Sequence, residues 1–186
     1  MKIVGLVGSP RKEGNTDTLL QKALEGAKSQ GAETTILYLN ELNIRGCQAC
    51  YACKKTGHCV VDDDMKKVYE TINESDGIIL GSPVYFGRLT AQTALFMDRL
   101  YAYLKPDFTN SLAAGKKITL VFTQNQPDAN LYAGLVNSTA QVLTRIGFET
   151  GPKPLVGTGL GPVGAALEKE EYLQSAFALG KELVNR

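Results

Sequence analysis

The chain has 186 residues, of which 44% are hydrophobic, and its 20 basic and 19 acidic side chains leave a formal net charge of +1. A chain of this length and composition can bury the core of one domain of ordinary size. Neither charge forms a long run that would attract nucleic acid or an anionic membrane, and no apolar stretch is long enough to span a bilayer. We therefore expect a single domain over residues 1–186, with no nucleic-acid or membrane partner.

The first segment, "KIVGLVG" (residues 2–8), is an apolar run that ends at a glycine turn. It predicts a strand rather than a signal peptide, because no small-residue cleavage site follows it. We therefore expect a cytoplasmic protein, and in the cytoplasm thiols stay reduced. Clustered cysteines in such a protein more often bind a metal or carry redox chemistry than form disulfides.

Short apolar runs alternate with longer helix-like stretches along the rest of the chain. The first helix is predicted to begin near Asn15, which can cap it, and to stop at Gly31. Further strands are predicted over 34–39, 77–82, 117–123 and 152–158, and further helices over 63–74, 90–104, 129–146 and 163–184. The alternation predicts an α/β fold, a parallel sheet with helices on both faces, and such sheets bind ligands beyond the carboxyl ends of their strands.

The connection from the first strand to the first helix, "GSPRKEGNT" (8–16), resembles a phosphate cradle. Backbone N–H groups at a helix N-terminus suit a phosphate monoester, and polar side chains are added here by Ser9, Arg11, Asn15 and Thr16. The glycine spacing matches neither the loop of nucleoside triphosphatases nor the dinucleotide fingerprint. An ordinary strand–helix turn is the alternative at this point.

The segment after the third strand, "GSPVYFGRLTAQTALFMDRL" (81–100), offers a surface for a planar ring. Tyr85 and Phe86 are stackable, and Gly87 permits close backbone approach, although aromatic residues beside a turn more often serve packing. The polar run after the fourth strand, 123–128, can hydrogen-bond the rim of the same ring, or it is a plain turn. Together the three loops describe a pocket suited to flavin mononucleotide (FMN).

All four cysteines lie in the long irregular connection over about 40–62. Cys47, Cys50, Cys53 and Cys59 form the pattern C-x2-C-x2-C-x5-C, in which short spacings let a tight loop present its sulfurs to one point. A zinc site more commonly uses two separated pairs, so the compact run favours an iron-sulfur cluster.

Two neighbouring features are assigned no chemistry. His58, the only histidine, is interpreted as an exposed loop residue. The three acids at 62–64 are explained by capping of the following helix and by its dipole.

The motifs "GSPR-x-x-GNT" and "GSPVYFGRLTAQ…MDR", with the cysteine segment between them, resemble the flavodoxin-like NAD(P)H-dependent FMN reductase superfamily, and specifically its iron-sulfur flavoprotein branch. The resemblance covers most of residues 1–104 and fades after Thr123. It implies a doubly wound, five-stranded parallel sheet of order 2-1-3-4-5, and it implies a 4Fe-4S cluster on the four cysteines. It implies FMN ligands in the three loops, namely Ser9, Arg11, Asn15 and Thr16 for the phosphate, Pro83, Val84, Tyr85, Phe86 and Gly87 for the isoalloxazine, and Thr123, Gln124 and Asn125 over the ring.

A protein with both cofactors converts between two-electron and one-electron transfer. We expect an FMN-dependent oxidoreductase that passes electrons between NAD(P)H or a ferredoxin-type donor and a small-molecule acceptor, such as a quinone or an oxygen species. Flavin N5 supplies the reactive atom, so no catalytic side chain is assigned. The resemblance further implies a homodimer or homotetramer with the flavin near a subunit interface, so that a cluster can serve the flavin of a neighbouring chain.

Two alternatives stay open at this point. One is a cluster-free NAD(P)H:FMN or quinone reductase whose cysteine loop only covers the pocket. The other is a non-catalytic, flavodoxin-like binding module stabilised by zinc.

Overall fold

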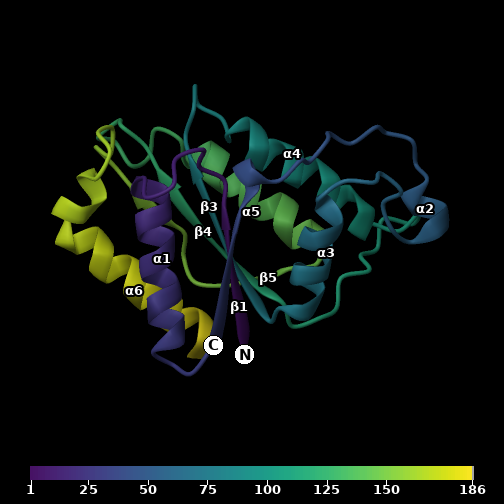
Figure 1. The fold of residues 1–186 in the computed structure, drawn as a ribbon, viewed down its shortest axis with the longest axis horizontal. Coiled ribbons are helices and arrows are strands. Elements are labelled where there is room, and N and C mark those ends of the chain that lie inside the picture. Colours follow the sequence, from purple (N-terminus) through teal and green to yellow (C-terminus); the bar gives the residue numbers. More distant parts are fainter. Residues whose placement is uncertain (186) are drawn as a thin grey trace.

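A parallel sheet lies between two layers of helices in the computed structural model, which describes residues 1–185 (Figure 1). Four strands follow the order β2-β1-β3-β4, and both β5 and β6 pair with β4 at the fifth position. The strands are β1 (Lys2–Val7), β2 (Glu33–Tyr38), β3 (Gly77–Pro83), β4 (Lys117–Thr123), β5 (Glu149–Thr150) and β6 (Leu155–Gly157). The predicted order 2-1-3-4-5 is therefore confirmed.

The fifth position is divided between two short strands for a local reason. Glu149 pairs with the beginning of β4 at Lys117, and Leu155 pairs further along β4 at Val121. The residues between them include Pro152 and Pro154. Proline has no N–H to give to a sheet, so the pairing is interrupted and resumes at β6.

Helices cover both faces, and side chains alternate between the two cores. The helices are α1 (Asn15–Lys28), α2 (Cys53–Thr56), α3 (Met65–Glu74), α4 (Ala91–Arg99), α5 (Ala133–Ile146) and α6 (Glu170–Asn185), with short 3-10 helices η1 (Leu39–Glu41), η2 (Leu100–Tyr103) and η3 (Ala165–Glu168). In β3, Ile78 and Leu80 pack on the side of α3, α4 and α5, whereas Ile79 packs on the side of α1 and α6 (Figure 1). This is the period-two alternation of a strand buried on both faces.

Glycines let α1 and α6 approach each other closely. A Cβ atom on Gly180 would lie 1.7 Å from the carbonyl oxygen of Ala23, and one on Gly26 would lie 2.0 Å from that of Phe177. Because these neighbours are backbone atoms, a larger residue at either position would force the helices apart. The close packing of α1 against α6, which cover one face of the sheet, therefore depends on both glycines.

Several helix ends differ from the predictions. The first helix begins at Asn15, but Gly14 occupies the capping position and no side chain caps the helix, so the prediction that Asn15 caps it is wrong. Thr90, in contrast, caps α4 and accepts a hydrogen bond from the Thr93 N–H. The last helix begins at Glu170, because residues 165–168 form the separate turn η3.

None of the helices within residues 1–185 has the length and apolar character needed to cross a membrane.

Candidate functional site

A pocket of about 250 Å³ opens at the carboxyl ends of β1, β3 and β4, where the sequence predicts a ligand site. Eight predicted residues line it, namely Ser9, Arg11, Asn15, Pro83, Val84, Tyr85, Thr123 and Asn125. Sequence analysis missed four further lining residues, namely Gly14, Leu160, Gly161 and Val163. The glycine-rich run "GTGLGP" (157–162), which begins at the last residue of β6, is the signal that could have indicated Leu160, Gly161 and the adjacent Val163, whereas Gly14 lies in the predicted first loop.

The first loop is held in shape by its own side chains. The Ser9 hydroxyl accepts a hydrogen bond from the Arg11 N–H at 3.1 Å, and the buried Asp17 carboxylate accepts one from the Glu13 N–H at 2.8 Å. Gly14 lies at the wall of the pocket and no side chain caps α1. The first N–H groups of a helix have no acceptor within it, so this N-terminus with Arg11 beside it suits an anion.

The Asn15 side chain fastens the far wall of the pocket. Its amide nitrogen donates to the carbonyl oxygens of Leu160 at 2.9 Å and Pro162 at 2.7 Å, and its oxygen accepts from the Ala166 N–H at 3.0 Å. The amide nitrogen has therefore committed both of its hydrogens. The predicted contact of Asn15 with a phosphate stays a prediction, and its backbone N–H is the group that can make it.

The Thr16 side chain points into the protein. Its hydroxyl oxygen lies 2.6 Å from that of Thr123, in a buried contact between α1 and β4. Gln124 is also buried, and its amide donates to the carbonyl oxygens of Gln126 and Asp128. Neither Thr16 nor Gln124 is among the residues that line the pocket. Their predicted contacts with FMN thus stay predictions.

The loop after β3 forms a tight turn beside the pocket. Tyr85 and Arg88 exchange two backbone hydrogen bonds of 2.9 and 3.0 Å. At its tip, Phe86 and Gly87 have φ angles of +51° and +72°, and the Phe86 side chain is 99% exposed. A fully exposed aromatic ring in a strained conformation gains little from folding, so a ligand or a partner is the natural contact for it.

The pocket residues fit FMN in both chemical character and position. An uncapped helix end and Arg11 lie at one side, where a phosphate would bind. Val84, Tyr85, Leu160 and Val163 supply apolar and aromatic surface for a flat ring. Thr123 and Asn125 add polar groups at the third side.

The second candidate site is a small cavity lined by all four cysteines together with Arg99, Tyr101 and neighbouring loop residues. Within residues 1–185, no three histidine, cysteine or acidic side chains gather closely enough to hold a single metal ion. A 4Fe-4S cluster is larger than an ion, and its four thiolates bind different irons at the corners of a cube. The four cysteines supply the thiolates that a cluster requires, and the cavity between them, about 20 Å³ in volume, must widen to hold it.

The cysteine loop is docked on η2. The Lys54 ammonium group donates to the carbonyl oxygens of Tyr101 and Leu104 and lies 3.6 Å from the centre of the Tyr101 ring. The Tyr51 ring packs edge-on against the same ring, with 6.3 Å between the centroids. These contacts fix the middle of the loop, including α2, against the protein.

A buried ion pair closes the base of the loop, and sequence analysis missed its acidic partner. Asp63 accepts hydrogen bonds from Arg99 Nη1 at 2.6 Å, from Arg99 Nη2 at 3.2 Å and from the Arg45 N–H at 2.9 Å, and both paired side chains are 1% exposed. The predicted capping role is confirmed in part, since Asp63 also accepts from the Met65 N–H. The sequence gives no signal that joins the acidic run 62–64 to the "MDR" segment.

The environment of Asp63 favours its charged form. Burial by itself would raise the pKa of Asp63, but the hydrogen bonds from Arg99 and from the Arg45 and Met65 backbone lower it below its ordinary value of 3.8. In the folded protein at neutral pH, the Asp63 carboxylate is therefore charged. Its ion pair with Arg99 is then present at the base of the cysteine loop.

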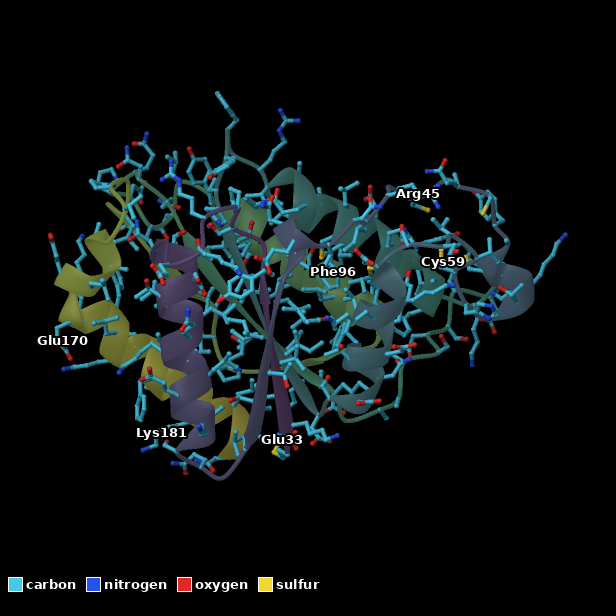
Figure 2. All side chains as sticks on the ribbon, viewed as in Figure 1. Glu33, Arg45, Cys59, Phe96, Glu170 and Lys181 are labelled. Carbon is cyan, nitrogen blue, oxygen red and sulfur yellow. The ribbon has the colours of Figure 1, made fainter. Side chains whose placement is uncertain are left out.

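The two sites lie at opposite ends of α4. Thr90 caps the end beside the pocket, and Arg99 ends the helix at the cysteine cavity. Figure 2 shows Cys59 and Arg45 at the end of the molecule that carries α2. A helix of nine residues is about 14 Å long. Among residues 1–185 none lines both sites, so the cysteine loop does not cover the pocket of its own chain.

Comparisons with known proteins find one family model and several relatives that match this chain. The profile of the NADPH-dependent FMN reductase family matches residues 1–159. An iron-sulfur flavoprotein of Archaeoglobus fulgidus is 40% identical over 194 residues, which cover 99% of this chain and 94% of that protein. One from Methanocaldococcus jannaschii is 44% identical over 99 residues, 53% of this chain and 51% of that protein. The match spans about half the length of this and several other relatives.

A solved structure shares the fold at low sequence identity. The NAD(P)H:quinone oxidoreductase from Methanothermobacter marburgensis superimposes with a TM-score of 0.78 and 17% identity, covering 98% of this chain and 96% of that one.

Proposed function

We propose, from the premise that this chain belongs to the NADPH-dependent FMN reductase family and to its iron-sulfur flavoprotein branch, that it is an FMN-dependent oxidoreductase that also carries a 4Fe-4S cluster. It uses NAD(P)H or a ferredoxin-type carrier as electron donor and a small molecule, such as a quinone or an oxygen species, as acceptor. One observation carries the proposal. A single chain places four cysteines around one cavity, separate from a pocket that fits FMN.

The chain's own residues have distinct tasks in this proposal. Arg11 and the N-terminus of α1 bind the phosphate, and Val84, Tyr85 and Leu160 hold and orient the ring. Cys47, Cys50, Cys53 and Cys59 hold the cluster. A flavin accepts electrons in pairs and releases them singly, whereas an iron-sulfur cluster carries one at a time.

The positions of the FMN pocket and the cysteine cavity are relevant to how copies of this chain would assemble. Within one chain they lie at opposite ends of α4, and the exposed Phe86 lies in the loop beside the pocket. We include in the proposal a homodimer or homotetramer in which a neighbouring chain packs against this loop. In such an assembly the cysteine loop of one chain approaches the flavin of another. The proposed setting is the cytoplasm, where the thiols stay reduced for cluster assembly.

The test compares two variants in the same loop. Cys50→Ala removes one thiol, and Lys55→Gln is the control, because Lys55 is exposed on α2 in the same loop and does not line the cysteine cavity. We expect Cys50→Ala to keep FMN but to lose iron and at least tenfold in electron transfer from a one-electron donor. Lys55→Gln should keep both the iron and the transfer rate. Unchanged iron content and transfer rate in Cys50→Ala would contradict the cluster, and loss of FMN as well would contradict two separate sites.

A further inference from the structure

Arg99 is part of the wall around the four cysteines. Its side chain is 1% exposed, and it lines the same cavity as Cys47, Cys50, Cys53 and Cys59. A guanidinium group keeps its charge at every physiological pH. A permanent positive charge is therefore buried where the proposed function places a cluster with four thiolates, which is negatively charged as a whole.

The hydrogen bonds of Arg99 leave one buried nitrogen without a partner. Nη1 donates to the Arg45 carbonyl oxygen at 2.7 Å and to Asp63 at 2.6 Å, and Nη2 donates to Asp63 at 3.2 Å. In the described part of the chain, Nε is buried and has no partner. Buried N–H groups are rarely left without an acceptor, because no water replaces the one they lose on folding.

The cysteine sulfurs line the same cavity as Arg99 and can accept a hydrogen bond. Asp63 holds the guanidinium by two of its nitrogens and fixes its orientation. The arrangement leaves Arg99 oriented by Asp63, with its Nε–H without an acceptor.

We propose that Arg99 donates its Nε–H to a sulfur atom of the bound cluster, and that this contact, set in place by Asp63, raises the reduction potential of the cluster. The proposal rests on the cluster of the proposed function. Hydrogen bonds to the sulfurs and local charge are two of the factors that set such potentials, and both act here in the same direction. A nearby positive charge and a donated hydrogen bond each stabilise the more negative, reduced cluster.

Substitutions of Arg99 and of Asp63 should shift the reduction potential of the cluster in opposite directions. Arg99→Gln removes the cation, so at a fixed applied potential we expect the ratio of reduced to oxidised cluster to fall at least tenfold, which corresponds to 59 mV for a one-electron couple. Asp63→Asn keeps a side-chain oxygen that can accept from Arg99 and removes a negative charge, so we expect that ratio to rise. Lys55→Gln is the control, because it removes an exposed positive charge from α2 in the same loop. Water screens that charge, and we expect a change of less than twofold.

The measurement is an anaerobic redox titration of the purified protein followed by electron paramagnetic resonance, with iron content determined for each variant. A wild-type protein without iron would contradict the proposed function itself. A loaded wild type with shifts of opposite sign in Arg99→Gln and Asp63→Asn supports the inference. If Arg99→Gln holds no iron, Asp63→Asn alone tests the inference: a rise in its ratio of reduced to oxidised cluster supports the inference, and an unchanged ratio overturns it. Unchanged potentials, or equal loss of iron from both variants, would give the pair a purely structural role and overturn the inference.

Discussion

The hydroxyl oxygens of Thr16 and Thr123 lie 2.6 Å apart in the interior, where they join the first turn of α1 to the end of β4. Of the three loops that surround the pocket, the first ends at α1 and the third begins at the end of β4. The contact therefore sets the position of the phosphate side of the pocket relative to its ring side.

Thr16→Val replaces one hydroxyl by a methyl group and leaves the Thr123 hydroxyl buried without this partner. We expect the free energy of unfolding, measured by urea denaturation, to fall by about 1–3 kcal/mol. Thr139→Val is the control, because the Thr139 hydroxyl is also buried but bonds only to a carbonyl of its own helix. An equal loss in both variants would mean that the Thr16–Thr123 contact has no special importance.

Asn15→Ala removes three hydrogen bonds that hold residues 160–166 against the first loop. We expect a loss of about 2 kcal/mol in unfolding free energy and weaker FMN binding, because the wall with Leu160 and Val163 becomes loose. Denaturation and fluorescence titration with FMN measure the two effects. Asn137→Ala, on the exposed side of α5, should change neither quantity. Full FMN affinity in Asn15→Ala would show that this wall does not contribute to binding.

Phe86→Ala separates binding from stability. Because its ring is fully exposed, its removal should leave the melting temperature of the FMN-free protein unchanged, while FMN affinity falls at least threefold through lost contact with the ring. Phe86 does not line the pocket itself but directly follows Tyr85, which does. Phe108→Ala is a close control, since Phe108 is 61% exposed and has a similar φ of +63°, but no residue of its own loop lines the pocket. Equal affinities in the two variants would exclude Phe86 from flavin binding.

Asp63→Asn should change stability in a pH-dependent way. The pKa of Asp63 is depressed in the folded protein, so its contribution is complete above its ordinary value of 3.8 and is lost as pH falls through the folded pKa. At pH 7 we expect the variant to be less stable by about 3–5 kcal/mol, and we expect the difference to shrink below pH 3.8.

Urea unfolding of the cluster-free protein between pH 3 and pH 7 measures this difference. Asp62→Asn is the control, because the pKa of Asp62 is also lowered by its pairing with Lys66 but the pair is exposed, so its effect should be much smaller than that of Asp63→Asn at every pH in this range. A difference for Asp63→Asn that stays constant with pH would contradict the depressed pKa.

The sequence predicted the parallel sheet and most of the pocket because the strands carry strong apolar patterns and the loops follow them directly, whereas the strand order was implied by the family resemblance. It could not predict that the Asn15 amide bonds residues 160–166, because that contact joins segments about 145 positions apart. The same holds for Asp63, whose partner Arg99 is 36 positions away. A charged residue at a helix start suggests capping, and only the folded chain shows that this one is buried against a cation.

The split of the last strand has a similar origin. Pro152 and Pro154 are visible in the sequence, yet which strand they interrupt depends on where β4 ends beside them. The position of the cysteine loop was equally hidden, because its docking depends on Lys54 reaching carbonyl groups that end η2. Long-range contacts of this kind leave no local pattern.

The central claim is that one chain holds both an FMN and a cluster on Cys47, Cys50, Cys53 and Cys59. The most direct test is the iron, zinc and FMN content of anaerobically purified protein, together with its absorption spectrum. We expect one FMN and about four irons per chain, with a broad absorption shoulder beside the flavin bands. FMN without iron would contradict the cluster, and zinc without flavin would contradict the account as a whole.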